Sequence, residues 1–417
     1  MSTNKLSVLA LFMTILVDAA GMALVYPILT PLFVHNSTFL FDPAVSVDAR
    51  NFIYGLILAI YPIMMFFGSP FLGTLSDKYG RRSILIICLA GNLAGLLLMG
   101  KGVAANSMFM IFLSRIISGI TAASMPIAQA AIIDISTEKT KAKNLSLITC
   151  ANSVGFVVGP LITAVLSKPL FGYTPTLSSP FYITSLLPLV TLLLLVFFFK
   201  ETSIPNRDLK LHFTSAFYSI YQGFTDRGTR LVLTILTGFL VGYYIFFNYL
   251  SIYALLSFGY DQFMESMLLG YFCVIFGCSF LFFIPKVTAK YSLNSCLLLS
   301  VAPQCVSVFG LIILTGSLSL WAIAAVMAIF VPCTYVVLLS ILSNRTEKAF
   351  QGRIIGVSSS VNSFAWGVAL LLTGLLQPYS RLLPFVVSTV ILALTFMLVR
   401  KFVKEPTSTL HIDDISS

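Results

Sequence analysis

The sequence predicts an all-α polytopic membrane protein with twelve transmembrane helices, and three observations lead to this fold class. Hydrophobic residues make up 58% of the 417 residues and charged residues only 10%, whereas soluble domains carry about 25% charged residues. Mean hydropathy is +0.97. The apolar runs continue from residue 6 to residue 403 rather than forming a single anchor. These values exclude a soluble globular domain and a disordered chain.

Each predicted span holds about 20 or more mostly apolar residues, the length that a helix needs to cross a bilayer. The runs do not alternate in polarity, as strands of a membrane β-barrel would. The first run carries Asp18 and Pro27 and lacks a small-residue cleavage site, so we expect a span and not a signal peptide. The twelve predicted spans are residues 6–34, 53–75, 82–101, 106–133, 145–167, 180–199, 230–257, 264–285, 292–315, 317–341, 353–376 and 379–400.

The distribution of basic residues predicts the orientation. With a cytoplasmic N-terminus, 20 of the 25 Lys and Arg residues fall in inside segments and 4 in outside segments, and the remaining one, Arg115, lies within a span. The positive-inside rule therefore predicts that both termini are cytoplasmic. The net charge of +10 follows from the same bias, so we expect no nucleic-acid partner.

The longest inside segment divides the predicted spans six and six, which predicts two six-helix bundles. Within it, Ser215–Gln222 is either a short amphipathic helix on the membrane or a plain linker. The end of span two, Gly73–Arg82, and the end of span eight, Ile284–Tyr291, share a basic turn with a tyrosine, as a duplicated unit would. The expected organisation is an N-terminal bundle at 1–200, a cytoplasmic central loop at 201–229, a C-terminal bundle at 230–403 and a polar cytoplasmic tail at 404–417.

The loop between spans two and three carries the sharpest motif, Gly73-Thr-Leu-Ser-Asp77-Lys-Tyr-Gly80-Arg81-Arg82. We expect Gly73 to let helices approach closely and Gly80 to permit the tight reversal. Asp77 is expected to pair with Arg81 or with a helix N-terminus. An ion pair between helices of this kind can stabilise one of two conformations of a protein. The loop would then act as a cytoplasmic gating loop. The alternative is a basic turn that only fixes topology.

A second motif lies in span five, where Gly155-Phe-Val-Val-Gly159-Pro160 combines two glycines four residues apart with a proline. Glycines at this spacing make a smooth helix face for close packing, and we expect Pro160 to kink the helix. Ordinary helix packing, with no functional role, is the alternative interpretation.

The loop pattern Gly-x-Leu-x-Asp-x-x-Gly-Arg-Arg resembles the signature loop of the major facilitator superfamily. The span-five motif is similar to the antiporter motif of that superfamily's proton-coupled drug exporters, although Thr163, Ala164 and Ser146 stand where glycines are expected. Asp18-Ala-Ala-Gly21 in span one and Ser114-Arg115-Ile-Ile-Ser-Gly119 in span four resemble the tetracycline-exporter-like branch of twelve-helix drug/proton antiporters. The resemblance implies two bundles around a central cavity that exchange access by rocking.

One departure from that branch concerns the substrate. Exporters of tetracycline carry an acidic residue in span three that contacts the drug–metal chelate. The corresponding position falls near Gly95 here, and span three contains no acidic residue. The resemblance therefore implies a transporter whose substrate is not tetracycline itself.

Two charged residues lie deep within spans, Asp18 and Arg115. A charge near the bilayer midplane costs at least about 2.5–3.5 kcal/mol and usually marks a substrate pathway or a proton relay. We expect Asp18 to carry the proton and Arg115 to modulate it by pairing. The alternatives are that Asp18 only caps a broken helix near Gly21 and that Arg115 extends outward to the membrane surface. Three further acids are expected near membrane boundaries: Asp134, Asp261 and Glu265.

Polar residues within other spans are candidates to line the cavity, and interhelical hydrogen bonds are the alternative role. These candidates are Gln129, Asn152, Asn248 and Asn362. Span seven is rich in aromatic residues, and apart from Asn248 we expect these to form an interfacial belt. The alternative is that they line a cavity, where aromatic side chains would suit an amphipathic organic substrate. The aromatic residues of span seven are Tyr243, Tyr244, Phe246, Phe247, Tyr249 and Tyr253.

The sequence predicts secondary active transport, in the form of proton-coupled export of a small organic molecule by alternating access. It contains no phosphate-binding loop, metal-ligand cluster or nucleophile–base pair, so we expect no enzyme, no cofactor and no metal site. The expected partners are a small-molecule substrate, protons and the lipid bilayer, and we expect a monomer in a bacterial inner membrane. The alternatives are an importer of a nutrient or metal-chelating metabolite on the same fold, and a membrane sensor or scaffold that does not transport.

Overall fold

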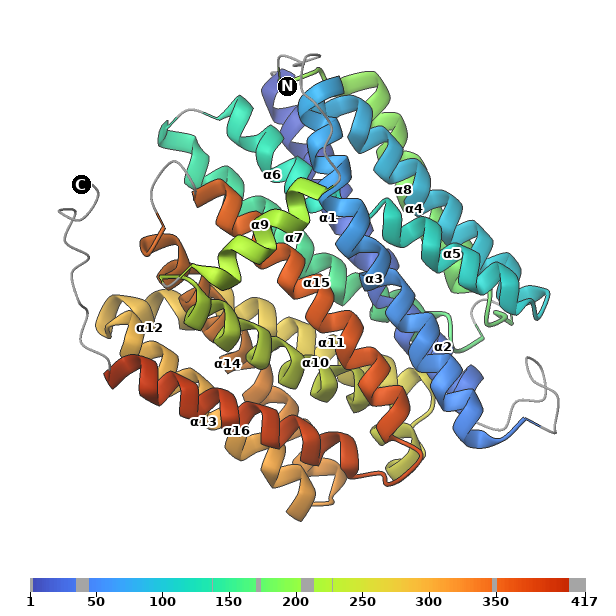
Figure 1. Ribbon diagram of the computed structural model, residues 1–417. Helices are drawn as coiled ribbons and strands as arrows, with labels where there is room; N and C mark the ends of the chain where they lie inside the picture. Colours follow the sequence, from blue (N-terminus) through green and yellow to red (C-terminus); the bar gives the residue numbers. More distant parts are fainter. Residues whose placement is uncertain are drawn as a thin grey trace.

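The computed structural model describes residues 3–34, 45–136, 138–169, 174–203, 214–226, 228–346 and 351–404. Within these ranges the chain forms helices and turns and no strand (Figure 1), which confirms the all-α prediction. Most of the predicted tail, and residues 204–213 and 227 of the predicted central loop, lie outside the described residues.

The first half of the chain folds into long helices, and its first span is interrupted once. Helices α1 and α2 meet at Leu24, which belongs to neither. Ser46 caps α3 by accepting a hydrogen bond from the backbone N–H of Ala49, and Gly80, with φ of +99°, makes the reversal into α4. The helices of this half are α1 (Thr3–Ala23), α2 (Val25–Val34), α3 (Val47–Tyr79), α4 (Arg81–Ala104), α5 (Met108–Ile120), α6 (Ser124–Ile135), α7 (Glu138–Val165) and α8 (Ser179–Phe198).

The second half is built in the same way. Gly259, with φ of +63°, ends α10, and Asp261 caps α11 by accepting from the backbone N–H of Met264 at 2.8 Å. A π-helical segment, η1, joins α11 to α12 so that they form one membrane-length helix. The helices are α9 (Thr214–Thr225), α10 (Arg230–Phe258), α11 (Gln262–Cys278), η1 (Ser279–Phe283), α12 (Ile284–Lys290), α13 (Leu293–Ile313), α14 (Ser317–Asn344), α15 (Gln351–Leu376) and α16 (Leu383–Lys404).

Eleven helices in the described ranges are long and apolar enough to cross a membrane. In addition, α7 contributes a shorter apolar segment, Cys150–Val165. The protein is therefore a multi-pass membrane protein, while the count of twelve spans and the sides of the termini stay predictions. Helix α9 confirms that Ser215–Gln222 is helical rather than a plain linker.

Helices α1–α8 pack mainly on one another, and so do α10–α16. In Figure 1 the two groups occupy the upper right and the lower left. The main contacts between the groups join α3 to α15 and α7 to α11, with smaller contacts from α2 to α10 and α11. Helix α9 rests against α10 and α15.

The α3–α15 contact is close in the middle of the helices and at one end, and we call this end the Gly55–Gly374 seam. A Cβ built on Gly55 would lie 2.9 Å from Cα of Gly374, so neither position has room for a side chain. At the opposite ends of the same helices, a Cβ on Gly73 or Gly356 would meet nothing within 4 Å. Figure 1 shows α3 and α15 converging at the lower right and diverging towards the upper left. The two halves are thus closed together at the seam.

Candidate functional site

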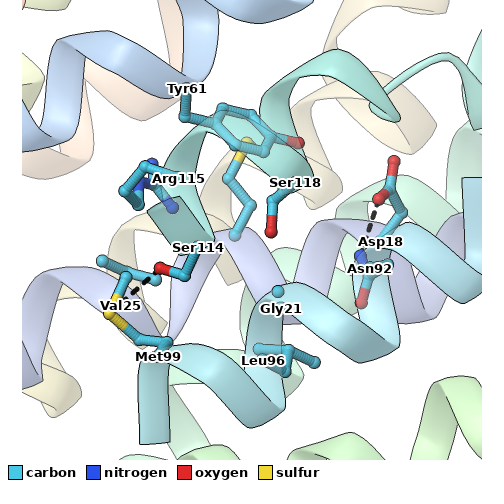
Figure 2. Close-up of a pocket in the computed structure, with 12 residues that line it drawn as sticks. Asp18, Gly21, Val25, Tyr61, Asn92, Leu96, Met99, Ser114, Arg115 and Ser118 are labelled. Carbon is cyan, nitrogen blue, oxygen red and sulfur yellow. Dashed lines mark hydrogen bonds between the residues drawn. The ribbon is translucent and has the colours of Figure 1, made fainter. Parts of the chain in front are cut away.

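Asp18 lies on α1, six residues before the interruption at Leu24. Its carboxylate accepts a hydrogen bond from Nδ2 of Asn92 on α4, at 2.8 Å (Figure 2). The helix is continuous around Asp18 and breaks only later, so Asp18 does not cap the break, and that alternative is wrong. The hydrogen bond instead fixes the orientation of a carboxyl group inside the helix bundle.

Arg115 lies on α5 with only 5% of its surface exposed. Its guanidinium carbon stands 4.6 Å from the centre of the Tyr61 ring, and its Nε atom has no hydrogen-bond partner. A cation over an aromatic face is stabilised by the ring quadrupole, more strongly where water is excluded. Arg115 therefore points into the protein, and the alternative, that it extends outward to the membrane surface, is wrong.

A small cavity connects these two residues. Its volume is about 20 Å³, enough for one or two water molecules and too little for an organic substrate. Figure 2 shows Asp18 at one end and Arg115 at the other, and among the described residues no ion pair joins them. The cavity is lined by Asp18, Gly21, Met22, Val25, Tyr61, Asn92, Gly95, Leu96, Met99, Ser114, Arg115 and Ser118.

Gly95, the position near which tetracycline exporters are expected to carry an acidic residue, lies in the wall of this cavity. A Cβ at Gly95 would collide with Oγ of Ser118 on α5 and would lie 3.3 Å from the carbonyl oxygen of Ser114. A side chain there would require Ser118 to change its rotamer. Helix α4 thus packs closely on α5 at the position where the sequence departs from the tetracycline exporters.

The two glycines of the span-five motif press α7 against α1 at the level of Asp18. A Cβ at Gly155 would collide with the carbonyl oxygen of Leu16, and one at Gly159 would lie 2.9 Å from the backbone nitrogen of Leu24. The smooth face predicted for the motif therefore packs directly on the helix that carries the candidate proton site. Helix α7 continues through Pro160 without interruption.

The signature loop forms a charged cluster around Arg81. The guanidinium of Arg81 pairs with Asp77 at 2.6 Å and with Asp134, at the end of α6, at 3.5 Å. The carboxylate of Glu201, beyond α8, accepts hydrogen bonds from the backbone N–H groups of Arg81 at 2.8 Å and Arg82 at 3.1 Å. An anion at a helix N-terminus is stabilised by these free donors and by the helix dipole. The cluster thus ties α3, α4, α6 and the end of α8 together.

Three expectations for this loop can be compared with the cluster. Asp77 pairs with Arg81, which was one of the two predicted partners. The N-terminus of α4 is occupied by the carboxylate of Glu201, so it is not the partner of Asp77. Gly73 was expected to allow close helix packing, but nothing lies within 4 Å of a Cβ built there, so this expectation is wrong for the conformation seen here.

The four polar candidates lie outside the wall of the Asp18–Arg115 cavity. Asn248 accepts hydrogen bonds from Tyr26 Oη at 3.1 Å and Trp366 Nε1 at 3.4 Å. Asn362 accepts one from Tyr244 Oη at 2.9 Å. Both asparagines thus form hydrogen bonds between helices, which was the alternative to lining the cavity. Two further candidates remain half-buried, Gln129 on α6 and Asn152 on α7.

The aromatic residues of α10 do not form an interfacial belt, so this expectation is wrong. Tyr243 and Phe247 are each 8% exposed and Tyr249 is fully buried. The ring of Phe247 meets Tyr26 of the other half at 5.9 Å between centroids, and the ring of Tyr249 meets Phe385 of its own half at 5.1 Å. The sequence signal was available, because a helix that is apolar on all sides is usually buried.

Sequence reasoning missed three residues near the site. Asn92 and Tyr61 hold Asp18 and Arg115 in place, and no spacing rule pointed to either. Glu265, in the first turn of α11, was expected near a membrane boundary, yet it is only 1% exposed. Burial of this acid depends on how the two halves meet, which the local sequence does not record.

Comparison with known proteins places these features in a family. The Major Facilitator Superfamily model matches residues 11–370. The class B tetracycline resistance protein of Escherichia coli is 31% identical over 222 residues, which are 52% of this chain and 50% of that protein. The matched segment thus spans about half the length of that relative. The class E tetracycline resistance protein of Escherichia coli is 26% identical over 371 residues, 86% of this chain and 84% of that protein.

Solved structures show the same fold. The crystal structure of a D-xylose-proton symporter superposes with a TM-score of 0.74 at 15% identity, covering 95% of this chain and 96% of that one. Identity this low shows a shared fold and not a shared substrate. The family match covers most of the chain, and the chain therefore belongs to the Major Facilitator Superfamily, a family of multi-pass membrane transporters and not of enzymes.

Proposed function

We propose that this protein exports a small organic molecule in exchange for protons, by alternating access. The observation that carries the proposal is the Asp18 carboxyl, held by Asn92 in a water-sized cavity inside the bundle. An ionisable group within a membrane span is costly and usually marks a substrate pathway or a proton relay. A proton needs no more room than this cavity provides.

The neighbouring contacts support exchange rather than leak. Gly155 and Gly159 bring α7 into backbone contact with α1 beside Asp18, so ions have no free path along this face. Arg115 lines the same cavity and makes no ion pair with Asp18. Its guanidinium group is therefore available to stabilise an anion in the cavity, either the ionised Asp18 carboxylate or an anionic group of the substrate. Similarity to tetracycline resistance proteins is consistent with export.

We further propose how the two ends alternate. The charged cluster around Arg81 stiffens the end of the N-terminal half at which α3 and α15 diverge. With the predicted orientation, this end faces the cytoplasm and the Gly55–Gly374 seam faces outward. The structure then represents a state closed to the outside, in a monomer within a bacterial inner membrane. Opening the seam and closing the Gly73 end would complete the transport cycle.

An importer on the same fold is the second candidate, because the symporter structure shares the whole architecture. In that case Asp18 would still bind the proton, but substrate and proton would move in the same direction. The two functions differ in the sign of coupling, and transport measurements separate them.

The test is transport into proteoliposomes under an imposed pH gradient, with a panel of lipophilic cations, drugs and metabolites. A gradient of one pH unit is worth about 1.4 kcal/mol per proton, which permits about tenfold accumulation for one-to-one exchange. We expect accumulation on the acidic side with the wild-type protein. Asp18→Asn is expected to abolish accumulation while retaining exchange of labelled for unlabelled substrate, because exchange needs no net proton movement.

The control is Asp261→Asn, which removes an exposed acid outside the cavity and keeps a good helix cap. It should accumulate substrate as the wild type does. Undiminished accumulation by Asp18→Asn would refute the assignment of the proton to Asp18. Accumulation on the alkaline side would favour the importer.

A further inference from the structure

Glu265 is a second buried acid for which the proposed mechanism has no role. Its side chain is 1% exposed, and neither carboxyl oxygen makes a hydrogen bond. It lies in the first turn of α11, in the C-terminal half, whereas Asp18 lies in the N-terminal half. Among the described residues no cation pairs with this carboxyl group. A buried carboxylate without a cation is strongly disfavoured, so the neutral, protonated form fits this conformation.

The polar neighbours of Glu265 come from both halves of the protein. They are the hydroxyl groups of Thr30 on α2 and Ser251 on α10. Oγ of Ser251 is itself buried without a hydrogen-bond partner. Glu265 and Ser251 both belong to the C-terminal half, and Thr30 is the neighbour that the N-terminal half contributes. A change in how the halves meet would therefore alter the surroundings of the Glu265 carboxyl group on the side of Thr30.

A short chain of contacts links Glu265 to the seam. Thr30 Oγ1 lies 2.8 Å from Oη of Tyr54, and Tyr54 directly precedes Gly55, which packs against Gly374. Any movement that opens the seam displaces Tyr54 and Thr30 relative to α11. Opening would therefore bring water to Glu265.

The elements around α11 offer Glu265 no compensating cation. They are α2, α7, α10, α14 and η1, and α14 and η1 contain no charged residue. The charges that face this region are Lys168, whose ammonium lies 3.9 Å from the centre of the Phe263 ring, and Arg115, which is held by Tyr61. On α11 itself, Asp261 is engaged as the helix cap. The titratable group that faces Glu265 is the phenol of Tyr54. The phenol of Tyr26 lies beyond it and interacts with Tyr54.

We propose that Glu265 is a second proton-binding site, in which the bound proton holds the Gly55–Gly374 seam closed and its release favours the open seam. The inference rests on the proposed alternating access, but it concerns the closure of the outer end and not the coupling at Asp18. In the open arrangement, water would solvate the ionised carboxylate. Proton binding would then close the end through which the substrate leaves.

The test measures seam opening directly, without transport. A thiol introduced by Asn51→Cys would sit in the seam, because Asn51 is 2% exposed and its carbonyl oxygen lies 3.2 Å from a Cβ built on Gly374. Its reaction with a water-soluble maleimide is followed by peptide mass spectrometry in lipid nanodiscs, where both membrane faces are accessible. At each pH, Glu265→Gln in the Asn51→Cys background is compared with Asn51→Cys alone, which cancels the pH dependence of thiol chemistry.

We expect labelling of the Asn51→Cys protein to rise with pH by several-fold more than labelling of the Glu265→Gln variant, which stays slow because glutamine mimics the protonated acid. Asp261→Asn, which removes the neighbouring exposed acid, should retain the full pH response. If Glu265→Gln does not fold, Glu265→Met provides the same comparison. Equal pH responses with and without Glu265 would overturn the inference, and transport lost in Asp18→Asn would still support the proposed function.

Discussion

At the scale of single residues, the hydrogen bond between Asn92 and Asp18 is the contact that most directly prepares the carboxyl group for its proposed role. It is the side-chain hydrogen bond of 2.8 Å that fixes the carboxylate at the cavity. A hydrogen bond to a charged acceptor contributes about 1.5–3 kcal/mol. The amide donates to the ionised form and does not neutralise it, so a proton can still bind.

Asn92→Ala is expected to slow transport by about tenfold without abolishing its dependence on the pH gradient. The reason is that Asp18 remains but is no longer oriented, and 1.4 kcal/mol corresponds to a factor of ten. Initial rates in proteoliposomes measure the effect, and Asn294→Ala, at the start of α13 and far from the cavity, is the matched control. A loss of gradient-driven transport as complete as in Asp18→Asn would contradict this division of roles.

Sequence reasoning found Asp18 and Arg115 because a charge deep within an apolar run is costly and therefore conspicuous. It did not find Glu265, which lies in the first turn of its helix, where acids are common as dipole partners. The depth of a residue along a membrane span can be predicted from the sequence. The burial of a side chain between the two bundles cannot, because it depends on contacts between residues more than 200 positions apart, such as Tyr26 with Asn248.

At the scale of helices, the crossing of α1 and α7 supports the site. Two glycines place α7 so close that backbone atoms of α1 occupy the positions of the missing side chains. Without a hydrophobic driving force between helices in lipid, such close packing is a main source of helix association.

Gly155→Ala is expected to lower the melting temperature of the purified protein by several degrees and to reduce transport. The added Cβ would collide with the Leu16 carbonyl, and overpacking of this kind costs about 1–3 kcal/mol. Gly270→Ala is the control, because a Cβ there meets nothing within 4 Å and alanine favours the helix. Equal melting temperatures for the two variants would show that the α1–α7 contact is not close in solution.

Hydropathy predicted the helical elements well, because a run of about 20 apolar residues in a membrane forms a spanning helix with few other structures open to it. The interruption of span four at Thr121–Ala123, between α5 and α6, follows Gly119 and precedes Pro126, two residues that weaken a helix. The interruption at Leu24 carries the same signal, because it lies between Gly21 and Pro27. The π-helical segment η1 likewise lies between Gly277 and Pro285.

At the scale of the whole molecule, the two halves meet through an aromatic and glycine-lined interface at one end and separate at the other. Tyr61 and Trp366, from opposite halves, lie 5.9 Å apart between ring centroids, and Gly55 and Gly374 pack directly. The Asp18–Arg115 cavity holds only water-sized ligands in this state. A substrate therefore requires a rearrangement of the two halves, which is the motion that the fold provides.

Antiport means that substrate and protons move in opposite directions through this protein. Proteoliposomes that contain a pH-sensitive dye test this without an imposed gradient, when the first substrate identified from the panel is added outside. We expect the lumen to become more alkaline as substrate enters, and Asp18→Asn to abolish this signal. Acidification of the lumen, or substrate entry by the wild-type protein with no pH change, would contradict it.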